Sequence, residues 1–248
     1  MELKQFFETH PEVAIAFSGG VDSAYLLYAA KQYGKRVKAY YVKTAFQPQF
    51  ELEDAQRLAE ELSAEIEVLK VDILCQSIIV NNPADRCYHC KKELFSHILK
   101  AAKADGFSVV LDGTNASDEA SDRPGMRAIS ELSVGSPLRE CGLTKSKIRQ
   151  LSKDAGLFTH DKPAYACLAT RIPTGEAITA AKLQRTERAE AYLSQLGFRD
   201  FRVRCQGDTA KIQIRETNLS LLIQHREVIL KELKQYYTSI VLDLEVRK

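Results

Sequence analysis

The first part of the chain alternates short apolar runs with longer amphipathic stretches. The run Val13–Phe17 is apolar at every position, which is typical of a strand buried on both faces of a sheet. Further strands are expected at Arg36–Val42, Ile66–Leu69 and Val109–Leu111, and helices after Ser23, over Glu51–Ser63, over Cys90–Lys103 and from Thr144 to Gly156. Repeated strand–helix units predict an α/β fold, a parallel sheet with helices on both faces, whose ligands lie at the carboxyl ends of the strands.

The pattern changes at about residue 173. Helices are expected over Thr179–Leu196 and Leu219–Tyr236, strands over Arg199–Cys205 and Ala210–Arg215 with a hairpin between them, and a last strand over Ile240–Val246. This order predicts a small α+β domain. We therefore expect a first domain over 1–162, a linker over 163–173 that carries an active-site cysteine, and a C-terminal domain over 174–248.

Composition and charge narrow the function classes. The 248 residues include 35 basic and 33 acidic side chains, and the net charge of +2 gives no argument for nucleic-acid binding. No apolar run approaches a membrane span and no signal-peptide pattern opens the chain, so we expect a cytoplasmic protein. In that compartment the six cysteines are expected to be thiols or metal ligands instead of disulfides.

The segment 18–23 reads SGGVDS and lies between the first predicted strand and the first predicted helix. Gly19 and Gly20 let the backbone turn sharply, and amides at a helix start bind anions, so a phosphate site is expected here. Ser18 and Ser23 supply further donors, and Asp22 suggests a bridging Mg²⁺. The alternative is a strand-to-helix turn that merely needs glycine.

A second polar turn, Asp112–Asn115, follows the last strand of the predicted sheet. The carboxyl ends of parallel strands lie at one edge, so this turn and the segment 18–23 can meet over one ligand. Gly113 and Thr114 are therefore candidate nucleotide-binding residues.

Two cysteine segments and an arginine pair carry the remaining candidate chemistry. Cys87 and Cys90 have the spacing of a metal-binding or redox pair, or are incidental thiols at a helix start. A metal would need further ligands, for which the candidates are His89, Cys75, Cys141, Cys167 and Cys205. Arg202 and Arg204 share one face of a strand, either as solvated side chains or as a receptor for phosphate or carboxylate.

The segment 18–23 resembles the PP-loop of the ATP pyrophosphatases, which cleave ATP between the α and β phosphates. Together with Asp112–Asn115, the stretch Asp118–Gly125, Cys167 ahead of Thr170-Arg171, and Arg202-Val203-Arg204, it resembles the LarE-type sulfur transferases over nearly the whole chain. Those enzymes make the nickel-pincer cofactor of lactate racemase. The resemblance implies an adenine nucleotide alpha hydrolase-like fold with a small C-terminal domain.

The resemblance implies an ATP-dependent reaction on a small anionic substrate. ATP with Mg²⁺ adenylates a carboxylate of pyridinium-3,5-biscarboxylic acid mononucleotide and releases pyrophosphate. A sulfur nucleophile then displaces AMP and leaves a thiocarboxylate, because the adenylated oxygen is a good leaving group. The resemblance also implies a homo-oligomer that works with other enzymes of the nickel-pincer pathway.

Site residues follow from the same resemblance, position by position. ATP phosphates and Mg²⁺ are expected at Ser18, Gly19, Gly20, Asp22 and Ser23, and the adenine and ribose wall at Thr44 and Phe46. Substrate phosphate or a metal is expected between the domains at Thr170, Arg171, Glu190, Arg202 and Arg204. Of all these, Asp22, Arg171 and Glu190 are expected to be catalytic, together with Cys167.

The source of the sulfur has two interpretations. Cys167 matches a cysteine that some members of the family sacrifice, so that it becomes dehydroalanine. That type lacks cysteines at the positions of Cys87 and Cys90, whereas this chain resembles the three-cysteine type. The three-cysteine type implies a [4Fe-4S] cluster held by Cys87, Cys90 and Cys167, with one iron left open for an extra sulfide. We expect the cluster, with the sacrificial reaction as the alternative.

Other classes of protein share the PP-loop. A tRNA-thiolating enzyme would use similar cysteines but should show a basic surface or an RNA-binding appendage, and neither is evident in the sequence. An amidating enzyme, such as an NAD or GMP synthetase, would need ammonia and no cysteine trio. A non-catalytic nucleotide-binding module is the third alternative.

Overall fold

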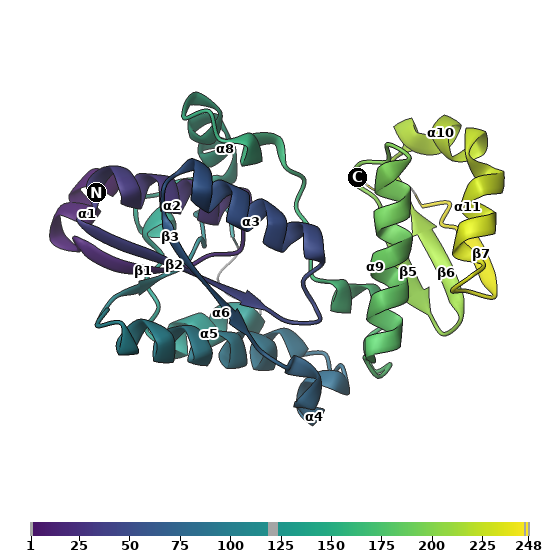
Figure 1. The fold of residues 1–248 in the computed structure, drawn as a ribbon, viewed down its shortest axis with the longest axis horizontal. Helices are drawn as coiled ribbons and strands as arrows, with labels where there is room; N and C mark the ends of the chain where they lie inside the picture. The colour runs from purple at the N-terminus through teal and green to yellow at the C-terminus, as the bar shows by residue number, and fades with distance from the viewer. Residues whose placement is uncertain (1, 119–123, 246, 248) are drawn as a thin grey trace. The chain divides into compact units, whose positions relative to one another are not determined.

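The computed structural model describes residues 2–118, 124–245 and 247. They form two compact units, the first made of Met1–Asp72 and Asp85–Lys162 and the second of Ile73–Ala84 and Pro163–Lys248 (Figure 1). The segment 73–84 thus groups with the second unit, although its sequence neighbours on both sides belong to the first. The sequence pattern did not predict this excursion, and the division into domains 1–162 and 174–248 stays a prediction.

A four-stranded parallel sheet in the order β3-β2-β1-β4 forms the centre of the first unit. Its strands are β1 (Glu12–Ala16), β2 (Arg36–Lys43), β3 (Glu65–Lys70) and β4 (Val110–Leu111). Ile15 of β1 lies opposite Ala39 of β2 on one side and Leu111 of β4 on the other. The predicted parallel α/β sheet is therefore confirmed, and the carboxyl ends of β1 and β4 are neighbours.

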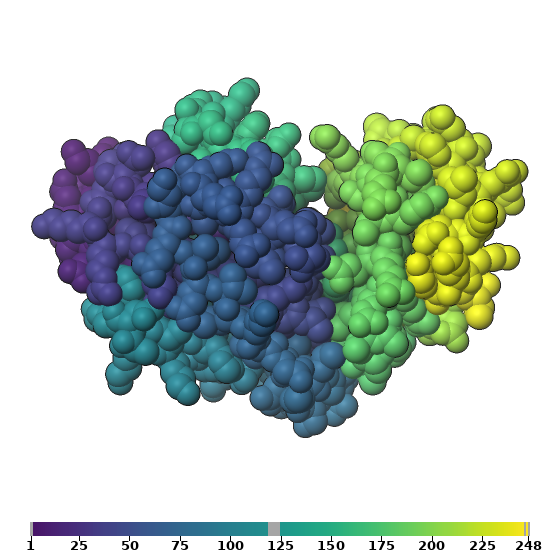
Figure 2. Space-filling model, in the orientation of Figure 1, coloured from purple at the N-terminus to yellow at the C-terminus, as the bar shows by residue number. Residues whose placement is uncertain are grey.

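Helices cover both faces of this sheet (Figure 1). They are α1 (Leu3–Thr9), α2 (Val21–Tyr33), α3 (Gln49–Glu61), α5 (Arg86–Ala104), α6 (Pro124–Glu131), α7 (Pro137–Glu140) and α8 (Lys145–Asp154). Val13 and Ile15 of β1 belong to a buried cluster with α1, α2, α3 and α8, while Ala14 and Ala16 belong to a second cluster with α5 and α6. In the space-filling view, side chains fill the spaces between the ribbons of this unit (Figure 2). Because both faces of β1 are covered, the strand is apolar at nearly every position.

The second unit holds a three-stranded sheet in the order β5-β6-β7. Its strands are β5 (Arg202–Gln206), β6 (Thr209–Gln213) and β7 (Ser239–Leu242), and its helices are α4 (Ser77–Val80), α9 (Ala180–Gln195), α10 (Leu219–Gln224) and α11 (Arg226–Leu233). The pair β5 and β6 is an antiparallel hairpin, as predicted, and β7 runs parallel to β6. A 3₁₀ turn, η3 (Leu168–Arg171), follows Cys167.

Two expectations for the elements need correction. The helix expected over Leu219–Tyr236 is broken at His225, whose φ of −99° and ψ of 9° lie in the bridge region outside the α-helix, so α10 ends and α11 begins there. The last strand ends at Leu242, and Val246 lies outside the described residues. Among the described residues, we find no helix with the length and apolar character that crossing a membrane requires.

Candidate functional site

The turn between β1 and α2 requires glycine at one position. Gly19 has a φ of 70°, in the left-handed region that favours glycine. A Cβ at this position would lie 3.2 Å from the Cβ of Ala55 on α3 and 3.3 Å from the carbonyl oxygen of Glu51. The close approach of α3 and the backbone conformation therefore exclude a larger side chain at Gly19.

Two serine hydroxyls shape this turn from inside. The Ser23 Oγ accepts a hydrogen bond from the Ser18 backbone N–H at 3.2 Å, lies 3.0 Å from the Ser18 Oγ, and donates to the Gly20 carbonyl at 3.2 Å. Helix α2 starts directly after Gly20, so the backbone amides of its first turn have no acceptor within the helix. Such a turn is suited to an anionic ligand, most simply a phosphate.

Asp22, in the first turn of α2, has two carboxylate oxygens in different situations. Its Oδ2 lies 2.5 Å from the Nζ of Lys145, the first residue of α8. Its Oδ1 is buried and has no hydrogen-bond partner in the described part of the chain. Burial raises the pKa of Asp22 above its ordinary value, although the hydrogen bond and charge of Lys145 act in the opposite direction. A buried carboxylate oxygen without a partner fits a ligand for Mg²⁺, as the sequence predicts.

The turn after β4 packs against the start of α2. A Cβ on Gly113 would lie 2.8 Å from the Ser23 backbone nitrogen, so the two turns are in contact. Asp112 is buried and accepts hydrogen bonds from the Ser136 hydroxyl at 2.7 Å and from the Thr114 hydroxyl at 2.5 Å. The structure thus brings Gly113 and Thr114 to the segment 18–23, and their nucleotide-binding role stays a prediction.

Thr44 and Phe46 lie just beyond β2, and both side chains are buried. The Thr44 backbone N–H and hydroxyl donate to the Gln47 side-chain oxygen at 2.9 and 2.8 Å, and the Phe46 N–H donates to the Thr44 hydroxyl at 3.0 Å. The Phe46 ring is completely inaccessible, so a nucleobase could stack on it only if neighbouring side chains moved. Their role in an adenine and ribose wall stays a prediction.

Cys87 and Cys90 are the second and fifth residues of α5, three positions apart. Both are thiols, Cys87 exposed and Cys90 partly exposed. The neighbouring Lys91 is packed closely on Gly125, whose added Cβ would lie 2.9 Å from the Lys91 Cδ. Burial lowers the pKa of Lys91, while the charges of Asp112 and other acidic groups oppose this shift. Lys91 was not a candidate from the sequence, although it follows Cys87 by four residues and so shares its helix face.

The described residues do not by themselves assemble a metal centre. Over residues 2–118, 124–245 and 247, no three or more His, Cys, Asp and Glu side chains are grouped so as to hold a metal ion. Cys167, the expected third ligand, is a partly exposed thiol of the second unit, directly before η3. The stretch Glu119–Arg123, part of the family-like pattern, lies outside the described residues.

A buried arginine–glutamate pair lies in the second unit. Arg171 is 1% exposed and donates to both carboxylate oxygens of Glu190, through Nε at 2.7 Å and Nη2 at 3.2 Å. Its Nη1 donates to the Thr170 hydroxyl at 2.8 Å, and this hydroxyl donates to the Cys167 carbonyl at 2.8 Å. Burial lowers the pKa of Arg171, but the hydrogen bonds and charge of Glu190 raise it more. This chain of contacts ties the Cys167 backbone to the buried ion pair.

Tyr165 completes this arrangement and was not a candidate from the sequence. Its hydroxyl donates to Glu190 Oε2 at 2.5 Å. The guanidinium carbons of Arg171 and Arg202 lie 4.7 and 5.1 Å from the centre of its ring. The ring therefore stabilises both cations by cation–π contact. Tyr165 is two residues from Cys167, and this proximity is the only signal in the sequence.

Arg202 and Arg204 bind neutral oxygens instead of carboxylates. Arg202 is 6% exposed and donates to the carbonyls of Phe201 and Ala164, both at 2.6 Å. Arg204 donates to the Gln213 side-chain oxygen at 2.9 Å and to the Thr170 carbonyl at 2.5 Å. In the described part of the chain neither guanidinium forms an ion pair. A solvated strand face, the alternative open from the sequence, is thus wrong for Arg202.

The pKa values of both arginines reflect this environment. Burial, followed by the charges of Arg171 and Arg247, lowers the pKa of Arg202 to about 10. The same three causes lower the pKa of Arg204. Cations that are desolvated and close to one another stabilise a bound anion, because the anion relieves their repulsion. We call Arg171, Arg202 and Arg204 the arginine group. Their charges are suited to an anion, and an anion-binding role for them stays a prediction.

Comparison with known proteins finds relatives over all or part of the chain. A family model described as queuosine biosynthesis protein QueC matches residues 12–93. The uncharacterized protein slr1717 of Synechocystis sp. is 38% identical over 251 residues, covering 98% of this chain and 92% of that protein. The pyridinium-3,5-bisthiocarboxylic acid mononucleotide synthase of Lactiplantibacillus plantarum is 33% identical over 235 residues, covering 94% and 85%. The tRNA-specific 2-thiouridylase MnmA of Thermotoga petrophila is 28% identical, covering 61% and 54%.

Proposed function

Because the chain belongs to the LarE-type family of ATP-dependent sulfur transferases, we propose that it converts carboxylates of pyridinium-3,5-biscarboxylic acid mononucleotide into thiocarboxylates. The QueC-like match over β1 to α5 and the MnmA relative agree with the PP-loop fold expected from the sequence. The product would be the bisthiocarboxylate that the Lactiplantibacillus relative is named for.

The observation that carries this proposal is the charge of the arginine group. Arg171 has a carboxylate partner in Glu190, but Arg202 and Arg204 donate to neutral oxygens and their pKa values are lowered by burial and by neighbouring cations. A substrate with one phosphate and two carboxylates supplies the negative charge that such a group lacks. We therefore assign the substrate phosphate, or one carboxylate, to Arg202 and Arg204, with Thr170 beside them.

The nucleotide belongs in the first unit in this proposal. The phosphates of ATP would bind the turn of Ser18, Gly19, Gly20 and Ser23, and Asp22 would hold Mg²⁺, which neutralises phosphate charge when bound. A substrate carboxylate oxygen attacks the α phosphorus, the bond from that phosphorus to the bridging oxygen breaks, and pyrophosphate leaves with the electron pair. A sulfur nucleophile then attacks the acyl carbon, and AMP leaves with the electrons of the acyl–oxygen bond.

For sulfur delivery we propose Cys87, Cys90 and Cys167. All three are thiols with at least partial exposure, and thiolates are the donor type that iron–sulfur clusters require. When bound, a [4Fe-4S] cluster would supply a sulfide at an iron that no cysteine ligates. In the alternative that the sequence left open, Cys167 gives up its own sulfur. Both mechanisms use Cys167, and an experiment distinguishes them.

The first experiment combines the protein with ATP, Mg²⁺, a sulfide source and the pyridinium substrate. Pyrophosphate and AMP should form only when the substrate is present, and mass spectrometry should show sulfur in place of a carboxylate oxygen. Asp22→Ala should abolish pyrophosphate release. If sulfur were transferred to tRNA and not to the pyridinium compound, the tRNA-thiolating alternative would replace this proposal.

The second experiment identifies the sulfur source. Anaerobically reconstituted protein should contain about four irons per chain, the count of a cubane cluster. Alanine at Cys87, Cys90 or Cys167 should remove the iron and the sulfur transfer but leave pyrophosphate release intact. Cys75→Ala, which removes another exposed thiol, should keep both. A colourless Cys87→Ala protein that transfers sulfur once and leaves dehydroalanine at Cys167 would instead establish the sacrificial reaction.

The family resemblance also motivates two proposals about partners. We propose that the chain forms a homo-oligomer and passes its product to other enzymes of the nickel-pincer pathway. Light scattering after size exclusion measures the first directly, and a monomeric mass at micromolar concentration would contradict it. The second is tested by supplying the product to a nickel-inserting enzyme and following cofactor formation.

A further inference from the structure

An ion pair joins the segment 18–23 to a helix far along the chain. Lys145 Nζ lies 2.5 Å from Asp22 Oδ2, across a sequence separation of 123 residues. The two side chains are 35% and 21% exposed. The pair therefore lies at the wall of the candidate nucleotide site, where solvent or a ligand can reach it.

The Lys145–Asp22 pair is not arranged as expected of an ion pair that only stabilises the fold. Lys145 engages one carboxylate oxygen, and the other, Oδ1, is buried without a hydrogen-bond partner among the described residues. A buried polar atom without a partner costs free energy, and a partly exposed ion pair returns little. A residue chosen for stability at position 22 would satisfy both oxygens or carry no charge.

The backbone of Lys145 is held, so only its side chain is free to change partner. Its N–H donates to the Ser117 hydroxyl at 3.0 Å, and the Ala116 N–H donates to the Leu143 carbonyl at 2.8 Å. The hydroxyl of Thr144 caps the first turn of α8. The loop after Asp112–Asn115 and the start of α8 are therefore tied together, and the flexible four-carbon stem of Lys145 starts from a fixed point.

We propose that Lys145 is a phosphate-binding catalytic residue that occupies Asp22 only until nucleotide arrives. On binding of ATP, Asp22 exchanges the Lys145 amine for Mg²⁺, and Lys145 then donates to the phosphates of the nucleotide. This inference rests on the proposed ATP-dependent function and adds a residue to it. Lysine is suited to the role because its ammonium binds phosphate as a point charge with three donors.

The exchange places positive charge where negative charge develops. When the bond between the α phosphorus and the bridging oxygen breaks, the departing pyrophosphate carries the electron pair. Lys145 would balance this charge without transferring a proton. Donors aimed at developing charge typically raise the rate about 100-fold to 1,000-fold. Removing the Lys145 ammonium should therefore lower the rate of pyrophosphate release strongly.

The test uses Lys145→Met, which keeps the stem and removes the charge, with Lys145→Arg to restore charge. Mn²⁺ is the probe, and electron paramagnetic resonance measures the free ion in the absence of nucleotide. Lys145→Met should bind Mn²⁺ about threefold to fivefold more tightly than the parent protein does, because the competing, partly exposed ion pair is lost. The kcat for pyrophosphate release should fall about 100-fold, with a smaller change in the KM for ATP. The kcat of Lys145→Arg should be at least about tenfold higher than that of Lys145→Met.

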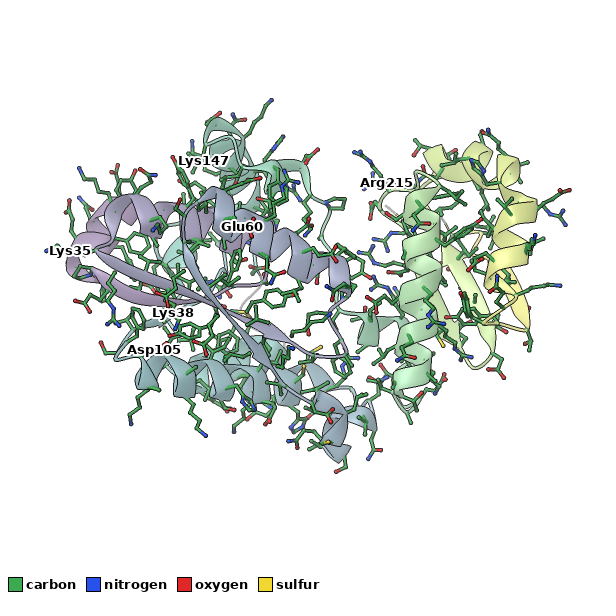
Figure 3. All side chains as sticks on the ribbon, in the orientation of Figure 1. Lys35, Lys38, Glu60, Asp105, Lys147 and Arg215 are labelled. Atoms are coloured by element: carbon green, nitrogen blue, oxygen red, sulfur yellow. The ribbon has the colours of Figure 1, made fainter. Side chains whose placement is uncertain are left out.

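Lys147→Met is the matched control, since Lys147 is exposed on the same helix (Figure 3). It should leave Mn²⁺ binding and pyrophosphate release unchanged. The inference fails if Lys145→Met releases pyrophosphate at the parent rate, or if its Mn²⁺ affinity equals that of the parent protein. Absence of pyrophosphate release by the parent protein itself would count against the proposed function instead, and the Mn²⁺ titration would still test the exchange at Asp22.

Discussion

Gly113 lies so close to Ser23 that an added Cβ would come within 2.8 Å of the Ser23 backbone nitrogen and 3.1 Å of its Cα. Real Cβ atoms do not approach backbone atoms this closely. The turn after β4 can therefore pack against the first turn of α2 only because residue 113 has no side chain. The contact explains how two segments about ninety residues apart in the chain build one candidate nucleotide site.

Gly113→Ala should therefore impair the use of ATP strongly, although it adds only one methyl group. The added methyl must push the two turns apart, and overpacking of this kind costs about 1–3 kcal/mol of unfolding free energy. Because the displaced atoms belong to the turn proposed to bind the phosphates of ATP, the KM for ATP in pyrophosphate release should rise at least about tenfold. Steady-state kinetics and urea unfolding measure the two effects.

A control for Gly113→Ala is available at the other end of the same helix. A Cβ on Gly34, which ends α2, would lie 2.7 Å from the Ala30 carbonyl oxygen. Gly34→Ala should lose a similar amount of stability and keep the parent KM for ATP. Equal kinetic damage in both variants would show that general destabilisation, and not the position of the turn, is responsible.

Arg204→Ala should weaken use of the pyridinium substrate much more than use of ATP. A hydrogen bond to a charged group contributes about 1.5–3 kcal/mol, so the KM for the pyridinium substrate should rise about 10-fold to 100-fold. The KM for ATP should change by less than about threefold, because the nucleotide is assigned to the first unit. Arg199→Ala, an exposed arginine of the same unit, should change neither constant. Parallel loss of both substrates in Arg204→Ala would remove Arg204 from the substrate site.

Much of the fold could be predicted because burial on both faces leaves a plain pattern. The apolar run Val13–Phe17 has one interpretation once helices flank it, and the polar turns after β1 and β4 must then lie at one edge. The hairpin of β5 and β6 was equally clear from two alternating strands around Gly207. These signals are local, or they follow from parallel topology alone.

The contacts that the sequence did not predict are long-range polar ones. Nothing near Lys145 or Asp22 indicates that they pair across 123 residues, and Tyr165 has no periodicity that marks it as a partner of Glu190. The break at His225 was missed because no proline or glycine marks it. Such features depend on the complete packing, in which a few hydrogen bonds outweigh weak local preferences.

Asn82 fastens the excursion 73–84 to the rest of the second unit. Its side chain donates to the carbonyls of Ile172, Pro173 and Glu176, the shortest at 2.8 Å to Pro173, and its φ is 53°. Asn82→Ala loses these hydrogen bonds and must also adopt a left-handed backbone. We expect it to reduce the unfolding free energy by about 2–3 kcal/mol.

Two further variants separate the causes at Asn82. Asn82→Gly accepts the backbone conformation, so it should lose only the side-chain hydrogen bonds and be about 1 kcal/mol more stable than Asn82→Ala. Ser133→Ala, at an exposed residue with the same φ of 53°, should cost about 1 kcal/mol or less. If Asn82→Ala were no worse than Ser133→Ala in urea unfolding, the side chain of Asn82 would not fasten the segment.

Asp200 should make the stability of the second unit pH-dependent in a defined direction. It pairs with Arg215, labelled in Figure 3, at 2.5 Å and with Arg247 at 3.0 Å. Although burial raises the pKa of Asp200, these two arginines lower it more, so the folded-state pKa lies below the ordinary value of 3.8. A lowered carboxyl pKa stabilises the folded state above the unfolded-state pKa, and this contribution disappears as the pH falls through the folded-state value.

Asp200→Asn should therefore reduce the unfolding free energy by about 1 kcal/mol between pH 5 and 8, a figure kept small because Arg215 is 52% exposed. The difference from the parent protein should shrink as the pH falls below about 4 and disappear well below the folded-state pKa, where Asp200 is protonated in both states. Asp208→Asn, which breaks a pair whose carboxylate is 72% exposed, should cost less than half as much. A stability difference for Asp200→Asn that grew as the pH was lowered would have the wrong sign and would contradict this account of the pair.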